Sequence, residues 1–284
     1  MQKQVILDPF QNVVASGVAI CDLNKFLGNV LEKITLTLGG TFTRAMITSI
    51  VLKANGKIIY ETDGTKLEAS NVYNGATTDV TLLKLDFMDR KARTVNAMQA
   101  GAIDLSSGSG IASFRMEVTI AGATSPTLAG VADVSPPVVS GSQAEKDEAG
   151  IRALMARRHR LSYVAPAAGT FALPIPHMDP AGGGSAYRRI YFYSANMTAI
   201  KTVREGIAEH ELTKLQNEAL QKDNFKVPQA NLVVFDPVQD GQLQGRLWDT
   251  RPASGCRSAQ FYGTFSAGET ITIETEELIG LGAY

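Results

Sequence analysis

Histidines are the first side chains to consider for metal chemistry, and this chain has only three. His159, His177 and His210 are far apart in the sequence and form no H-x-H pair. A metal-dependent enzyme such as a two-domain cupin needs clustered histidines and a glutamate. We therefore interpret all three histidines as structural or surface residues.

Two aspartates offer a candidate calcium site. Asp236 and Asp240 lie in the turn-like sequence DPVQDG, and Ca²⁺ prefers carboxylate and carbonyl oxygens. The spacing lacks the full ligand series of a dedicated calcium loop, so a capped turn or a solvated edge is the alternative. A structural calcium ion is the one cofactor that the sequence leaves open.

The common catalytic motifs are absent. The chain contains no G-x-x-x-x-G-K-[ST], G-x-G-x-x-G, G-x-S-x-G or C-x-x-C sequence. The glycine-rich stretches 107–110 and 182–184 do not lie between a predicted strand and a predicted helix, so turns are the better interpretation. The sequence predicts no catalytic residue and a protein that is not an enzyme.

Two further clusters have a functional and a structural interpretation. A basic cluster fits the end of a helix or a contact with a neighbouring subunit better than a phosphate or lipid site. It consists of Arg152, Arg157, Arg158 and Arg160. Alternation in the run 187–193 places Tyr191 and Tyr193 on one face of a strand and Phe192 on the other. Packing in or on a sheet is therefore favoured over a sugar-binding platform for this run and for Trp248.

Composition narrows the class of protein. The 284 residues include 27 basic and 28 acidic side chains, which argues against direct binding of nucleic acid. Only Cys21 and Cys256 are present, so we expect no disulfide framework and assembly in a reducing cytoplasm. No signal peptide and no apolar run of 18 residues is evident.

Alternating apolar and polar residues predict strands in both halves of the chain. In the first half, Asn55-Gly56 between two apolar runs predicts a hairpin. The strands expected there are 34–38, 43–53, 57–60, 78–88 and 111–121. Those expected in the second half are 160–165, 187–195, 197–203, 229–236, 258–266 and 269–275. Helices are expected near 66–69 and at 209–224.

A faint repeat links the two halves. The stretch 46–56 (MITSIVLKANG) matches 196–206 (NMTAIKTVREG) at Thr, Ile and Gly, and the same offset aligns LLKLD at 82–86 with LVVFD at 232–236. The Pro-containing stretch 122–141 looks like an extended connector. It separates domains 1–140 and 141–284, and acidic residues followed by basic ones predict a junction helix at about 143–160.

These patterns predict an all-β protein of two tandem β-sandwiches, with short helical insertions and a helix at the junction. The first half, with LTLGGTFTRAMITSIVLKANGKIIYE and DVTLLKLDF, resembles the N-terminal jelly roll of the major coat protein of corticovirus-type phages. The second half, with HELTKLQNEALQKDN and SAQFYGTFSAGETITIETEEL, resembles the C-terminal jelly roll of that family.

The resemblance implies that each sandwich is an eight-stranded jelly roll, and that the chain is a double jelly-roll major capsid protein of a tailless icosahedral bacteriophage. In such viruses, trimers of the coat protein form pseudo-hexagonal tiles of a virion shell around an internal membrane. Expected partners are further copies of the chain, a penton protein at the vertices, and the inner membrane or its proteins. The alternative is a viral spike that binds a receptor or a carbohydrate through the same kind of sandwich.

Overall fold

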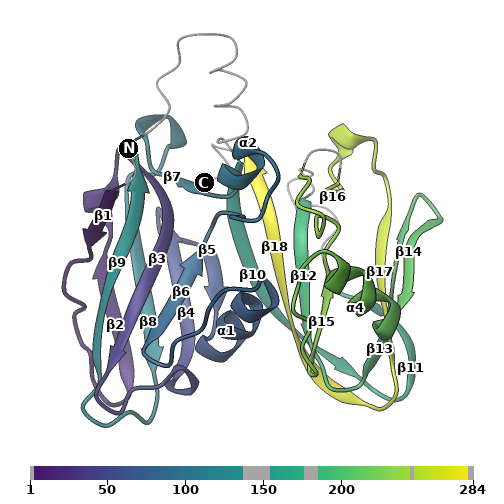
Figure 1. Ribbon diagram of the computed structural model, residues 1–284, viewed down its shortest axis with the longest axis horizontal. Helices are drawn as coiled ribbons and strands as arrows, with labels where there is room; N and C mark the ends of the chain where they lie inside the picture. Colours follow the sequence, from purple (N-terminus) through teal and green to yellow (C-terminus); the bar gives the residue numbers. More distant parts are fainter. Residues whose placement is uncertain (1–2, 137–153, 176–184, 244–245, 281–284) are drawn as a thin grey trace. The chain divides into compact units, whose positions relative to one another are not determined.

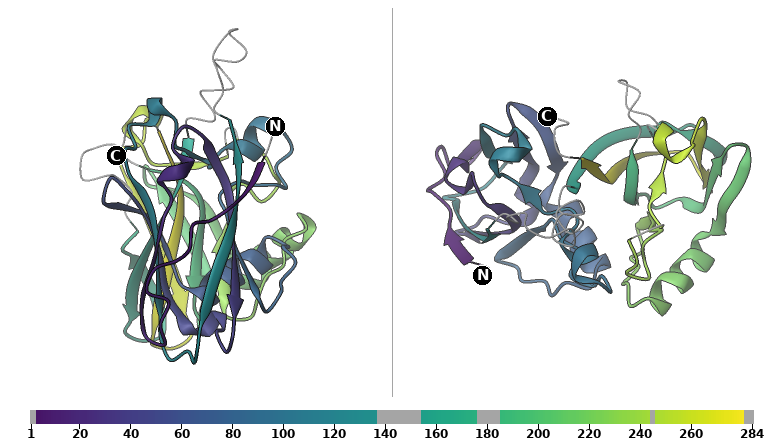
Figure 2. Two further views of the ribbon diagram at one scale, coloured as in Figure 1. Left: turned by 90° about the vertical axis from the view of Figure 1, so that its left-hand side faces the viewer. Right: turned by 90° about the horizontal axis from the view of Figure 1, so that it is seen from above.

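A computed structural model describes residues 3–136, 154–175, 185–243 and 246–280. The chain divides into two compact units. The first contains Met1–Val72, Ala76–His159 and Ile279–Tyr284, and the second contains Tyr73–Gly75 and Arg160–Leu278. Each unit is a sandwich of two sheets (Figures 1 and 2).

One sheet of the first unit has the strand order β1-β9-β3-β6. Its strands are β1 (Lys3–Ile6), β9 (Thr127–Ser135), β3 (Val30–Gly39) and β6 (Leu82–Asp86), and the short β7 (Ile103–Asp104) also pairs with β3. The other sheet has the order β2-β8-β4-β5. Its strands are β2 (Gly17–Asp22), β8 (Phe114–Ile120), β4 (Ile47–Ala54) and β5 (Lys57–Thr62). The strand β10 (Leu154–Ala165) begins in this unit and pairs in parallel with β5 through Arg158 and Tyr60.

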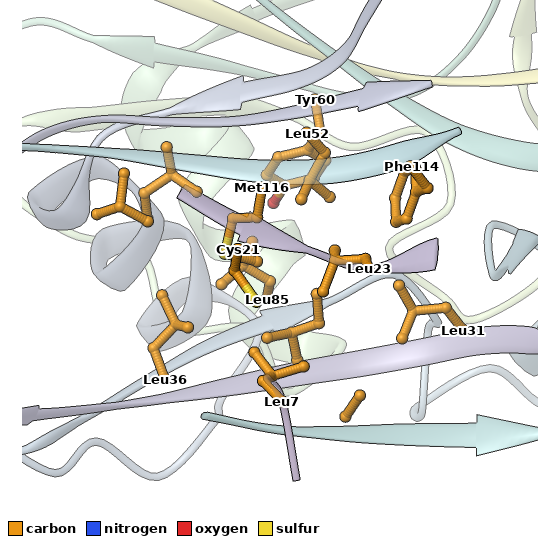
Figure 3. Packing of buried hydrophobic residues seen from close by; sticks show 14 of the residues in the cluster. Leu7, Cys21, Leu23, Leu31, Leu36, Leu52, Tyr60, Leu85, Phe114 and Met116 are labelled. Atoms are coloured by element: carbon orange, nitrogen blue, oxygen red, sulfur yellow. The ribbon is translucent and has the colours of Figure 1, made fainter. Parts of the chain in front are cut away.

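Aliphatic side chains fill the space between these two sheets. Leu36 and Leu85 point inward from one sheet, and Leu52 and Met116 from the other, all fully buried (Figure 3). On β8, Phe114, Met116, Val118 and Ile120 alternate with more exposed residues, as their spacing in the sequence predicts. The apolar face of each strand therefore defines the core.

The second unit repeats this arrangement. One sheet contains the end of β10, then β18 (Glu269–Gly280), β12 (Ala186–Tyr193) and β15 (Leu232–Phe235), and the short β16 (Trp248–Asp249) pairs with β12. The other has the order β11 (Gly169–Leu173), β17 (Ala259–Phe265), β13 (Met197–Arg204) and β14 (Ile207–Thr213). An aromatic core lies between them, formed by Tyr187, Phe192, Phe235, Trp248 and Phe261.

Short helices join the strands. The first half has α1 (Gly64–Tyr73) and α2 (Val95–Gln99), and the second half has α4 (Lys214–Asp223). The single-turn 3-10 helices are η1 (Asn24–Phe26), η2 (Arg44–Met46), η3 (Ser107–Ser109) and η4 (Pro252–Ser254). No helix among the described residues is long and apolar enough to cross a membrane.

The two units correspond strand by strand, so residues that occupy the same place in the two ladders are called counterparts here. The helices α1 and α4 begin 150 positions apart, at Gly64 and Lys214, and β6 and β15 also begin 150 apart, at Leu82 and Leu232. The correspondence is completed by the pairs β1 and β10, β2 and β11, β3 and β12, β4 and β13, β5 and β14, β8 and β17, and β9 and β18. The repeat seen in the sequence therefore reflects duplicated topology.

Irregularities in the ladders recur at counterpart positions. The β4–β5 register shifts between Leu52 and Lys53, and the β13–β14 register shifts 150 positions later, between Thr202 and Val203. The β3–β9 register shifts between Leu31 and Lys33, and the β12–β18 register between Tyr187 and Arg189. Bulges redirect side chains, so their recurrence preserves which residues face outward in both units.

The capping of the two helices also recurs. At α1, Asp63 accepts a hydrogen bond from the backbone N–H of Lys66, and at α4 the counterpart Thr213 accepts one from Gln216. Burial opposes ionisation of Asp63, but hydrogen bonds from Lys66 and Thr65 hold its pKa below the usual value. A different side chain at the same position therefore satisfies the same unpaired backbone group.

Both units have the same two-residue turn. Asn55-Gly56 and Glu205-Gly206 all have positive φ, which is typical of a type I′ hairpin turn. A Cβ atom on either glycine would meet nothing within 4 Å, so the cost of an alanine substitution would come from backbone strain alone. We expect Gly56→Ala and Gly206→Ala each to lower the free energy of unfolding by roughly 1–2 kcal/mol.

Urea denaturation of the two glycine variants checks this expectation. Gly108→Ala is the matched control, because its φ is not positive and its Cβ would meet only the Ser106 hydroxyl, at 3.9 Å. We expect the control to unfold at the wild-type midpoint. A normal midpoint for either Gly56→Ala or Gly206→Ala would show that its turn is not under this constraint.

The structure corrects four predictions. A junction helix was predicted at about 143–160, but residues 154–160 form the start of β10. Pairing of β10 with β5 outweighs the helical charge pattern. The rest of the predicted helix lies outside the described residues. The helix predicted from residue 209 begins at 214, since 209–213 extend the hairpin as β14. The connector predicted at 122–141 contains β9. The strand predicted from residue 78 begins at Leu82.

Candidate functional site

Three charged side chains meet on the outer face of the β18-β12-β15 sheet. Arg189 on β12 lies opposite Glu276 on β18, and Asp236 directly follows β15. The Arg189 Nε lies 3.0 Å from an Asp236 carboxylate oxygen, and its Nη1 lies 3.6 Å from Glu276. At most 9% of any of these side chains is exposed, so the second unit contains a buried charge triad.

Further charges and hydroxyls complete this cluster. Arg188, which the bulge turns toward the same cluster, binds Glu276, and Lys226 lies 3.7 Å from Asp236. The Tyr191 hydroxyl donates to Glu276 at 3.3 Å. Opposite charges therefore surround each buried ion, as they must where water is excluded.

The segment Tyr73–Gly75, a part of the second unit, covers the triad. The Tyr73 hydroxyl donates to Asp236 at 3.0 Å, and its ring lies edge-on to Tyr191 at 6.2 Å. Asn74 donates to the Tyr191 hydroxyl at 3.4 Å and accepts from Lys226 at 3.1 Å. Burial and the adjacent Asp236 carboxylate raise the pKa of Tyr73 well above its ordinary value.

The first unit has the same triad at counterpart positions. Lys33 on β3 lies opposite Asp133 on β9 and Asp86 on β6. The Lys33 ammonium lies 2.7 Å from Asp133, while Arg90 pairs with Asp86 at 2.8 Å. Partial burial raises the pKa of Asp86, although Arg90 opposes that change.

The two triads differ in exposure. In the first unit 23% of the Lys33 side chain and 28% of the Asp86 side chain are exposed, against 3% for Arg189 and none for Asp236. Thr37, the outward residue in line with Lys33, is also exposed, whereas its counterpart Tyr193 is half-buried. The second triad is thus covered throughout, whereas in the first Lys33 and Asp86 are partly exposed and only Asp133 is buried.

The arrangement is suited to holding surfaces together and not to turnover. Each carboxylate in the second triad accepts from a cation or a hydroxyl, and no nucleophile is positioned beside a general base among these residues. Ion pairs of this kind fix the register between packed surfaces, because a mismatched partner leaves a charge buried and unpaired.

The calcium candidates lie in capped turns. The Asp236 carboxylate accepts from the backbone N–H of Val238 at 3.2 Å and is paired with Arg189. Asp240 accepts from the N–H of Gln242 at 3.1 Å and lies 3.6 Å from Arg246. Among the described residues, no group of three or more His, Cys, Asp or Glu side chains could hold a metal. The geometry favours the capped-turn alternative at both aspartates.

The histidines are not brought together in the described part of the chain. His159 lies on β10 and His210 on β14, while His177 is outside the described residues. His210 packs edge-on against Phe235 with ring centroids 5.2 Å apart, and burial lowers its pKa. Arg157, Arg158 and Arg160 lie on β10 and not at a helix end, and Arg152 is outside the described residues.

The aromatic run has the predicted faces. Phe192 lies in the core beside Phe261, with ring centroids 5.2 Å apart, while the hydroxyls of Tyr191 and Tyr193 reach Glu276 and Glu274 on the outer face. Trp248 is also buried in the core. These rings do not form an exposed sugar-binding surface.

Sequence patterns pointed to one part of the triads. The alignment of LLKLD with LVVFD already pairs Asp86 with Asp236. The cations and the remaining carboxylates were missed, because Lys33 and Arg189 are 156 positions apart and Asp133 and Glu276 are 143 apart. Only the ladder register reveals these counterparts.

Two jelly-roll units in tandem define the class of double jelly-roll proteins. Family models identify the particular family: the Viral coat protein P2 N-terminal domain matches residues 4–135, and the Viral coat protein P2 C-terminal domain matches residues 155–280. The chain therefore belongs to the viral coat protein P2 family and is a structural, non-enzymatic component of a virion capsid. No curated protein matches the sequence significantly.

Solved structures share this fold. The major capsid protein P2 from Bacteriophage PM2 has a TM-score of 0.82 at 16% identity, and the match covers 100% of this chain and 98% of that one. The STIV MCP, from Sulfolobus Turreted Icosahedral Virus, has a TM-score of 0.70 at 11% identity, with 100% and 98% covered. The PBCV-1 virus capsid has a TM-score of 0.61 at 10% identity, with 98% and 93% covered.

Proposed function

We propose that this coat protein is the major capsid protein of its virus and forms homotrimers, in which three chains supply six jelly rolls to a pseudo-hexagonal tile. The observation that supports this proposal is that the two units repeat the same strand order, the same bulges and the same charge triads. Two similar units in one chain give a trimer approximate six-fold symmetry, which suits the hexagonal positions of a closed shell.

The same proposal includes the other partners of the tile. Tiles associate with each other in an icosahedral lattice, a penton protein fills the vertices, and an internal membrane or its proteins lie beneath the shell. Assembly takes place in the host cytoplasm. The proposed boundary between domains 1–140 and 141–284 falls between the two family matches.

We propose that trimers form without calcium, because a calcium ion at Asp236 would have to compete with Arg189 and Lys226. A single experiment tests both points. Light scattering of the purified protein should give three times the chain mass of 30.4 kDa, with or without EDTA. A monomer at high concentration would contradict the proposed trimer. Dissociation of the trimer by EDTA would show that its formation does require calcium.

The spike alternative has less support. A receptor- or carbohydrate-binding sandwich needs exposed aromatic rings on a binding surface. Tyr187, Tyr191 and Trp248 are buried instead, and they contribute to the core or to the charge cluster.

A further inference from the structure

The segment that follows α4 is the counterpart of the segment that covers the buried triad. Tyr73, Asn74 and Gly75 end α1, and 150 positions later Asp223, Asn224 and Phe225 end α4. Gly75 and Phe225 share a left-handed backbone conformation, with φ of 70° and 58°. The two segments therefore have similar backbone form and different environments.

The segment after α4 has exposed apolar side chains. Of the Phe225 side chain 82% is exposed, and a left-handed backbone is unfavourable for such a bulky residue. Leu220 and Val227 on either side are 44% and 45% exposed. A cluster of exposed apolar residues on one short segment is typical of a surface that a partner covers.

The partly exposed triad of the first unit is the matching surface. Its counterpart in the second unit is buried under Tyr73 and Asn74. Asn74 donates to the Tyr191 hydroxyl, and the counterpart of Tyr191 is Thr35, a half-buried residue whose hydroxyl is also an acceptor. Asn224, the counterpart of Asn74, is half-buried, and its side-chain amide donates one hydrogen to the Leu220 carbonyl at 2.9 Å, which leaves its second hydrogen for the contact.

We propose that residues 223–225 of one chain dock on the Lys33, Asp86 and Asp133 triad of a second copy, while Lys226 stays in the charge cluster of its own unit. The occupant is a second copy, because this chain carries both the docking segment and the triad that it would cover. The covered triad of the second unit is the template for this contact. The interface is heterologous, so it closes into a ring when the rotation is right. This inference rests on the proposed trimer and names the surfaces that form it.

A second pair of counterparts supports the same contact. In the first unit the edge of β5 is paired with β10, whereas β14, the counterpart of β5, is an edge strand in the second unit. The counterpart of β10 is β1, which is the edge strand beside β9. Ile207 on β14 and Ile6 on β1 are 68% and 73% exposed. Pairing of β14 with β1 of the next copy would cover both edges.

Cross-linking tests the proposed contact directly. The variant Asn224→Cys/Thr35→Cys, treated with a short bis-maleimide, should give covalent dimers and trimers on a denaturing gel. Cys21 and Cys256 are buried, and burial raises the pKa of Cys21 to about 11, so the native thiols should not react. Each single cysteine variant is the control and should stay monomeric on the gel.

A substitution in the segment gives an independent measurement. Phe225→Glu should weaken trimer formation at least about thirtyfold, as loss of a central aromatic anchor does. It should leave the melting temperature of the monomer unchanged, because the ring is exposed in the single chain. Val18→Glu changes an exposed residue on β2, in the opposite sheet of the first unit, and should have no effect on association.

The outcomes separate this inference from the proposed function. Trimers that form normally with Phe225→Glu, or that give no cross-link between positions 224 and 35, would overturn the contact and leave the trimer intact. A wild-type protein that stays monomeric would overturn both.

Discussion

Arg189→Met should lower the free energy of unfolding of the second unit by about 3–5 kcal/mol. The substitution removes the cation that lies 3.0 Å from Asp236 and 3.6 Å from Glu276, so that these two buried carboxylates keep only Lys226 and Arg188 as neighbouring cations. Trp248 is the single tryptophan of the chain and lies in the core of this unit, so its fluorescence during urea denaturation reports the change.

The matched control for this prediction is the counterpart residue of the first unit. Lys33→Met removes an ion pair with Asp133 whose lysine is 23% exposed, and Arg90 remains 3.7 Å from that aspartate. We expect a cost of about 1 kcal/mol or less, measured by circular dichroism. Equal costs for the two variants would show that burial of the second triad does not distinguish it from the first.

Phe261→Ala should also destabilise the second unit by about 3–5 kcal/mol, because it leaves a cavity in the aromatic core. The Phe261 ring lies 5.2 Å from Phe192 and Phe235 and 5.8 Å from Trp248, measured between centroids. The same tryptophan fluorescence measures the loss, which should appear as a lower urea midpoint with little change in slope.

A conservative variant separates volume from aromatic packing. Met116 is the counterpart of Phe261 in the first unit, where Leu36 and Leu85 replace Phe192 and Phe235. Phe261→Met should therefore cost less than Phe261→Ala, because methionine fills most of the space. If both variants were as stable as the wild type, the aromatic cluster would not support the fold as described.

Local patterns in the sequence were sufficient for much of the fold. The Asn55-Gly56 turn, the alternation in β8 and the helix α4 are each specified by neighbouring residues. The start of β10 could not be predicted in this way, since its strand conformation depends on pairing with β5, almost a hundred positions earlier. Similarly, β9 contains Gly130 and two alanines, so its strand pattern is weak in sequence.

The charge triads also depend on residues far apart in the sequence, so neighbouring residues do not predict them. Asp86 and Asp236 align at the offset of the sequence repeat. Lys33 and Asp133 align with Arg189 and Glu276 only when the strand registers, each with its bulge, are known. A linear sequence does not reveal that Asp236 lies beside Arg189, so the sequence alone left both a calcium site and a capped turn open at this aspartate.

The central claim is that duplication gives the chain two equivalent units with which three copies build a six-sided tile. Cryo-electron microscopy of the purified protein tests it most directly. The account predicts three-fold particles with six similar lobes and the same kind of contact at all six junctions. Particles with one chain, or a ring whose alternate junctions use unrelated surfaces, would contradict it.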